Sequence, residues 1–209
     1  MNGIKRTRLF LVMAGIVTVS QGCMAYRTRI PEPSKTYRER QGGYLRARLT
    51  LNAEHWANGH AVQSAHRTCL DRHKKAALKA FSKCGLFREV GPAVSNPDIE
   101  IVVDSKEEER YIEALPAVCG LTLMIFPAWV DVATETRAKV TTVDGKPIES
   151  TSAQSEARVI IELLLLPLTP TVFVTSARST RDVYRSMAVE MAASPRIKEL
   201  IQAKQKQAK

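Results

Sequence analysis

The chain has 209 residues, with 31 Lys or Arg against 21 Asp or Glu, and its net charge is +10. This length is enough for one domain with a substantial core. The sequence contains no phosphate-binding glycine loop, Gly-x-Ser-x-Gly elbow, paired CxxC motif or HExxH motif, so it excludes the enzyme classes that such motifs identify.

The first 22 residues have the features of a bacterial export signal. Basic residues stand at Lys5, Arg6 and Arg8, and an apolar stretch of about eleven residues follows, Leu9–Val19. A helix needs about twenty apolar residues to cross a bilayer, so this stretch is too short to span one. We therefore expect residues 1–22 to be removed as a signal peptide.

Residues 19–23 resemble the lipobox of bacterial lipoproteins, in which a cysteine receives a diacylglycerol and becomes the first residue of the mature protein. Gly22 and Cys23 match that pattern. The resemblance implies lipidation at Cys23, and Met24 in place of an aspartate implies anchoring at the periplasmic face of the outer membrane. The alternative is ordinary secretion with cleavage after Ala25, which would give a soluble periplasmic protein.

Residues 23–43 predict a tether, because Pro31, Pro33 and Gly42-Gly43 interrupt both helix and strand. A flexible chain of this length spans about 25 Å. Basic residues outnumber acidic ones in this segment, which favours a location near anionic lipid head groups or simply a soluble linker. Export separates the protein from nucleic acid, so we expect the membrane and an envelope protein as partners and no nucleic acid.

Folding signals begin at Tyr44. Alternation from Leu45 to Leu51 predicts a half-buried strand, and an apolar stripe at three- and four-residue spacing predicts a helix over 61–83. Residues 86–90 and 99–103 are typical of short strands, and this order predicts a sheet with the helix packed on one face. His55 and His60 would then lie in a loop.

A long antiparallel hairpin is predicted from Trp129 to Val159. Asp144-Gly145 is a strong signal for a two-residue turn with positive φ at both positions. If Val143 pairs with Lys146, partner numbers sum to 289. This register collects apolar or small side chains on one face and polar side chains on the other.

Two apolar runs, 120–129 and 159–174, continue the arms of this hairpin. Glu162, Pro167 and Pro170 interrupt the second run, so buried core segments or a patch that touches membrane or partner are favoured over a spanning helix.

Helices are expected at the C-terminus. A capping box, Ser179 with Asp182, predicts a helix over 180–192, and Ser194-Pro195 predicts the start of a second. The sequence therefore predicts an α+β fold for residues 44–209, with a small mixed or antiparallel sheet, a long hairpin, one helix packed on the sheet and C-terminal helices.

His66, Cys69 and His73 lie at i, i+3 and i+7 and so share one face of the predicted helix. Imidazole and thiolate ligands at this spacing are typical of Zn or Cu sites if a fourth ligand comes from elsewhere. The alternative is that Cys69 is a core residue flanked by two structural histidines, and we expect no cofactor. No nucleophile can be matched to the histidines by spacing, so a hydrolase would need a site assembled from distant residues.

Three cysteines remain besides Cys23. One helix would hold Cys69 and Cys84 about 22 Å apart, which is too far for a disulfide. Any bridge would therefore use Cys119, with Cys84 favoured because both precede Gly-Leu. Three reduced cysteines are the alternative.

The segments Cys84-Gly85-Leu86-Phe87, Asp98–Ile101 and Leu121–Pro127 together resemble a class of largely uncharacterised bacterial lipoproteins. The architecture also resembles, more distantly, the α/β domains of penicillin-binding-protein activator lipoproteins. The resemblance covers about half of the mature chain. It implies a noncatalytic envelope protein that acts as an interaction or accessory module at the outer membrane.

Overall fold

A computed structural model describes residues 22–40, 42–121, 128–162 and 170–207, and it has the predicted α+β fold. The described residues form strands, helices and one 3-10 turn, with bounds as follows: β1 Gly22–Arg29, η1 Glu32–Thr36, β2 Leu45–Ala57, β3 His60–Ala61, α2 Gln63–Ser82, β4 Phe87–Gly91, β5 Ile99–Arg110, α3 Ala114–Leu121, β6 Ala128–Thr142, β7 Pro147–Glu162, α4 Pro170–Ala193 and α5 Pro195–Gln207.

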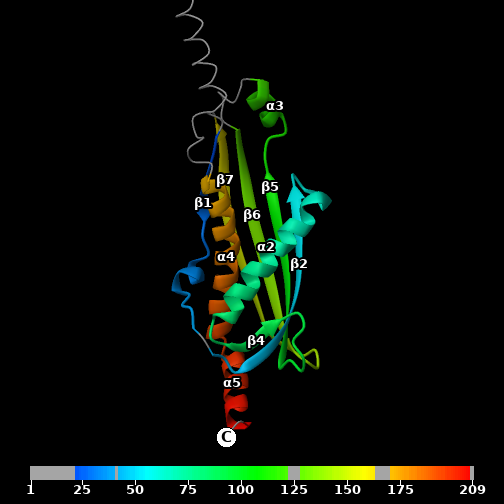
Figure 1. The fold of residues 1–209 in the computed structure, drawn as a ribbon, viewed down its shortest axis with the longest axis vertical. Helices are drawn as coiled ribbons and strands as arrows, with labels where there is room; N and C mark the ends of the chain where they lie inside the picture. The colour runs from blue at the N-terminus through cyan, green and yellow to red at the C-terminus, as the bar shows by residue number, and fades with distance from the viewer. Residues whose placement is uncertain (1–21, 41, 122–127, 163–169, 208–209) are drawn as a thin grey trace, which may run out of the picture.

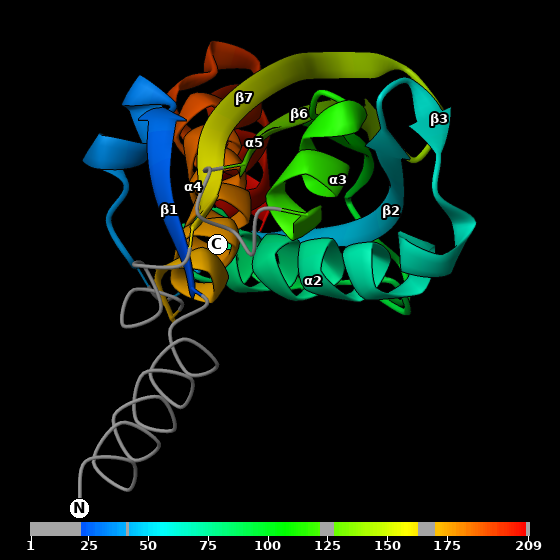
Figure 2. The ribbon, with the colours of Figure 1, turned by 90° about the horizontal axis from the view of Figure 1, so that it is seen from above.

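The strands form a mixed seven-stranded sheet in the order β1-β7-β6-β5-β2-β3, and β4 also pairs with β2. β2 runs parallel to β4 and β5, whereas the other neighbours are antiparallel. Figure 1 shows α2 and α4 side by side on one face, and Figure 2 shows the sheet curving around them. The core lies between this concave face and the two helices.

The apolar half of the core lies at the end of the sheet where β2 and β5 begin. Alternate residues of β2 and β5 from Leu45 and Ile99 onward face α2, as the period of two requires. Phe81 of α2 and Tyr184 of α4 are fully buried against them. Complete burial of such a side chain stabilises the fold by about 1.5–3 kcal/mol.

The segment predicted as a tether, 23–43, is instead part of the fold. Residues 22–29 form the edge strand β1, which pairs antiparallel with β7, and η1 packs against α4. Arg27 of β1 donates a charged hydrogen bond to Asp182 of α4. The local sequence did not predict this strand, because the backbone hydrogen bonds that hold it come from β7, more than a hundred residues further along the chain.

The predicted hairpin register is confirmed. Val130 pairs with Val159 and Asp131 with Arg158, and the sum of 289 holds as far as Val140. The predicted turn is wrong. Gly145 donates to the carbonyl of Thr142 and has φ +79°, so a longer turn closes the hairpin and the register shifts after Val140.

Of three other expectations, two differ from the structure and one, the start of α5, is confirmed. The helix predicted from a Ser179 cap begins at Pro170, so Ser179 is buried within α4 and caps nothing. α5 begins at Pro195 as predicted, but the hydroxyl of Ser194 donates to Glu149 across 2.5 Å. The Cys84–Cys119 disulfide is wrong, because Cys84 is a free thiol. It lies between α2 and β4, and β4 is at the opposite end of the sheet from α3 (Figure 1).

Candidate functional site

The concave face of the sheet changes from apolar to polar along its length. In β5 the inward positions Ile99, Ile101 and Val103 are followed by Ser105, Glu107 and Glu109. β2 continues beyond its predicted end, so His55 lies on the same face of the sheet and not in a loop. In the sequence, the signal for this site is that β5 continues to alternate between inward and outward residues beyond Val103. The composition of these residues by itself indicates only an acidic stretch.

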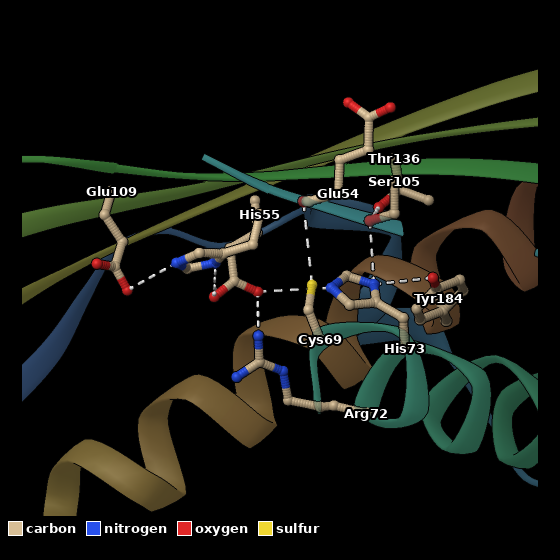
Figure 3. Close-up of polar contacts among 10 residues, drawn as sticks. Glu54, His55, Cys69, Arg72, His73, Ser105, Glu109, Thr136 and Tyr184 are labelled. Carbon is tan, nitrogen blue, oxygen red and sulfur yellow. Dashed lines mark hydrogen bonds and ion pairs between the residues drawn. The ribbon is translucent and has the colours of Figure 1, made fainter. Parts of the chain in front are cut away.

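Helix α2 places further polar side chains over this half of the sheet. Cys69 and His73 are one turn apart and buried, and Arg72 lies beside them with 31% of its side chain exposed. Figure 3 shows these groups converging with others from β2, β5, β6 and α4. We call the whole set the polar cluster: His55, Cys69, Arg72, His73, Ser105, Glu107, Glu109, Thr136 and Tyr184.

Glu107 is the centre of the polar cluster, with only 6% of its side chain exposed. Its Oε2 accepts a hydrogen bond from Arg72 and lies 3.5 Å from Nε2 of His73, while Oε1 lies 3.8 Å from Nδ1 of His55. Burial alone would raise the pKa of this carboxyl, but His73 and Arg72 outweigh burial and lower it. Glu107 is therefore a buried carboxylate held by cationic and imidazole neighbours.

His73 is fully buried, and its two ring nitrogens have different partners. Nδ1 lies 2.9 Å from the Tyr184 hydroxyl and 3.0 Å from the Ser105 hydroxyl, and Ser105 also contacts Thr136 at 2.8 Å. Because Nε2 faces a carboxylate, the favoured tautomer carries its proton on Nε2 and accepts at Nδ1. Burial raises the pKa of Tyr184, which keeps this hydroxyl protonated as a donor.

Cys69 approaches the same carboxylate from α2. Burial and the charge of Glu107 raise the pKa of its thiol to about 11, so the metal-free thiol is protonated at neutral pH. On the far side of the His55 ring, Nε2 lies 3.5 Å from Oε1 of Glu109.

The predicted ligand set His66, Cys69 and His73 is not assembled. His66 is exposed on α2, whereas Cys69 and His73 are buried. The structure instead brings donor atoms of His55, Cys69 and Glu107 within 4.8 Å of one another, and this is the one such group among the described residues. Sequence reasoning missed His55 and Glu107 because β2 and β5, not the helix, position them.

A cavity of about 140 Å³ opens beside the polar cluster. Arg72, Glu107 and Glu109 line it on the side of the polar cluster, and Val132 and Val159 are among its apolar walls. A cavity needs about 10–15 Å³ of such space to hold one water molecule, so this one has room for several or for a small ligand.

A second feature is the end of the sheet where β1 begins, which we call the anchor end. Strand pairing brings Gly22 of β1 and Glu162 of β7 together there, close to the start of β6 and the end of β5. α3 lies at this end of the sheet (Figure 1). Exposed hydrophobic residues belong to α3, to the segment before it and to the start of β6, namely Ile112, Val118, Leu121 and Trp129. Leu121 is 85% exposed.

Parts of the two apolar runs, 122–127 and 163–169, lie outside the described residues. The described parts of those runs belong to α3, β6, β7 and α4. Among the described helices, none has the length and apolar character needed to cross a membrane.

No family model and no curated protein matches the chain. Among solved structures, it is similar to a PelC dodecamer from Paraburkholderia phytofirmans, with 10% identity and a TM-score of 0.33 over 79% of this chain and 98% of that one. It is also similar to a minor lipoprotein from Acinetobacter baumannii, with 13% identity and a TM-score of 0.31 over 73% of this chain and 92% of that one. Similarity this low establishes no shared function.

Proposed function

We propose that the protein is a lipoprotein of the bacterial envelope, anchored through Cys23 at the periplasmic face of the outer membrane, where it acts as a noncatalytic accessory module. The observation that carries this proposal is the position of Cys23. Its backbone pairs with Ile161 at the anchor end, where exposed apolar side chains also gather.

The pairing of β1 with β7 limits how far a lipid on Cys23 would let the domain move from the membrane. A lipid on a flexible tether would let the domain move about 25 Å from the membrane. A lipid on Cys23, the second residue of β1, leaves no such slack, because the following residues are hydrogen bonded into the sheet. The anchor end then faces the bilayer, and Leu121 and Trp129 meet the interfacial region, where apolar and aromatic side chains are favoured.

A noncatalytic role agrees with the burial of the polar cluster. Ser105, His73 and Glu107 form a series of polar contacts that resembles a hydrolase triad. His73 is 0% exposed and Ser105 5% exposed, and the Ser105 hydroxyl already contacts both His73 and Thr136. A substrate would have to displace core packing to reach that oxygen, so this series favours a structural role.

The anchor is tested by Cys23→Ala in cells grown with a labelled fatty acid. We expect the variant to lose the label and to leave the membrane fraction, whereas Cys84→Ser, which changes a thiol elsewhere, should keep both. Unchanged labelling and fractionation of Cys23→Ala would contradict lipidation at Cys23, and an unlabelled wild type in the soluble fraction would favour the soluble periplasmic alternative.

The orientation is tested with a photo-crosslinking amino acid in the lipidated protein on outer-membrane vesicles. A probe at Leu121 should crosslink lipid, and a probe at Val143, which is 55% exposed at the hairpin turn, should not. Equal lipid crosslinking at both positions, or none at Leu121, would contradict the orientation. Protein crosslinked at either probe would identify the partner surface.

A further inference from the structure

Three side chains of different donor chemistry converge in the polar cluster, and one of them, Glu107, also lines the cavity. His55 comes from β2, Cys69 from α2 and Glu107 from β5, and one donor atom of each lies within 4.8 Å of the others. Tetrahedral zinc with bonds of about 2.0–2.3 Å requires ligand atoms about 3.3–3.8 Å apart. Nδ1 of His55 and Oε1 of Glu107 already lie 3.8 Å apart, so small side-chain movements would complete the geometry.

We propose that His55, Cys69 and Glu107 bind one Zn²⁺ ion. A combination of imidazole, thiolate and carboxylate suits zinc, whereas calcium and magnesium prefer oxygen ligands and Cu(I) prefers sulfur. The site is separate from the proposed lipid anchor, because its three ligands come from β2, β5 and α2 and none comes from β1.

The neighbours of the three ligands orient them as the neighbours of zinc ligands commonly do. Nε2 of His55 lies 3.5 Å from Oε1 of Glu109, and a carboxylate on the far nitrogen of a ligand histidine fixes the ring and its tautomer. Oε2 of Glu107 is held by Arg72 and lies close to His73, which leaves Oε1 turned toward His55. Both carboxylates therefore have the positions that a metal on Nδ1 requires.

The charges also balance. A zinc ion with the Cys69 thiolate and the Glu107 carboxylate is neutral, and the nearby charges of Arg72 and Glu109 offset each other. The cavity beside Glu107 and Glu109 would supply a water molecule as the fourth ligand.

The test uses the mature lipidated chain in detergent, stripped with a chelator and dialysed against zinc. We expect one Zn²⁺ ion bound per chain by elemental analysis, and a thiolate-to-cobalt charge-transfer band when Co²⁺ replaces zinc. Cys69→Ala and His55→Gln should each lower zinc affinity by about tenfold or more, measured against a competing chromogenic chelator. Cys69→Ala should also remove the cobalt band.

Two matched controls separate this site from others in the chain. Cys84→Ser removes the one other free thiol found among the residues that the structure describes, and His66→Ala removes an exposed histidine on α2. Both variants should bind zinc with wild-type affinity. Circular dichroism in chelator checks that each variant is folded, and His55→Gln serves if Cys69→Ala does not fold. A wild-type chain that binds no zinc, folded His55→Gln protein with wild-type affinity, or loss of zinc in His66→Ala would each overturn the proposal.

Discussion

Replacement of Glu107 by glutamine tests the core of the polar cluster, because it keeps the shape of the side chain and removes only its charge. The charge of Arg72 would then face a neutral amide. Breaking a buried ion pair costs about 3–5 kcal/mol when the remaining charge is fully buried. Arg72 keeps 31% of its side chain in solvent, so we expect a loss of about 2 kcal/mol in the free energy of unfolding at neutral pH.

The stability that the Glu107 carboxylate contributes should be lost at acid pH. Burial opposes ionisation of Glu107, but His73 and Arg72 outweigh it and hold the pKa of its carboxyl below the ordinary value of 4.5. A lowered pKa in the folded state contributes stability that is fully present above the unfolded pKa and is lost as pH falls through the folded pKa. The difference between wild type and Glu107→Gln should therefore shrink toward zero as the pH falls below 4.5.

The assay is urea denaturation in chelator across this pH range, so that bound metal does not contribute. Glu108→Gln is the matched control, because Glu108 is the next residue of β5 and pairs with Lys106 and Arg110 at the surface. It should change the free energy of unfolding by no more than about 0.5 kcal/mol. A Glu107→Gln protein as stable as wild type at neutral pH, or a difference that persists at acid pH, would refute this account of the cluster.

Three further predictions concern the fold. Phe81→Ala should lower the free energy of unfolding by about 3–5 kcal/mol in urea, because its ring is fully buried in the core; a loss under about 1 kcal/mol would contradict that packing. Gly43→Ala should give little folded protein by circular dichroism, since the new Cβ would overlap the backbone of Leu86 and Phe87, and a normally folded variant would argue against this close approach. Trypsin should cut after Arg27 faster in Asp182→Asn than in wild type, because the substitution removes the ion pair between β1 and α4. Rapid cleavage of the wild-type protein would instead indicate that residues 23–43 are a flexible tether.

The sequence predicted those parts of the fold whose signal is local or repeated. The register of β6 with β7 followed from two strands whose apolar and polar faces agree over many residues, and it holds from Val130 to Val140. The bounds of α2 were predicted within two residues because its buried stripe repeats at helical spacing. The turn itself was wrong, since Asp144-Gly145 fits more than one turn type and the choice depends on the exact pairing at the strand ends.

Site residues were harder to predict, because strands far apart in the chain assemble them. Spacing within one helix selected His66, Cys69 and His73, but the curved sheet determines which face of that helix is covered and leaves His66 in solvent. His55 and Glu107 reach Cys69 only because β2 and β5 are paired in parallel, with His55 directly beside Glu107 in the register.

The sequence by itself determined the α+β class and the hairpin register, and it predicts an export signal and a lipidated Cys23, since each depends on residues near one another or on a repeated alternation. The tertiary structure alone decided that residues 22–29 form an edge strand and not a tether, because hydrogen bonds to β7 supply what the local sequence lacks. It also decided which polar side chains meet. Strand pairing and the packing of α2 bury Glu107 beside Cys69 and His55, and buried groups of this kind are stable only with such partners around them.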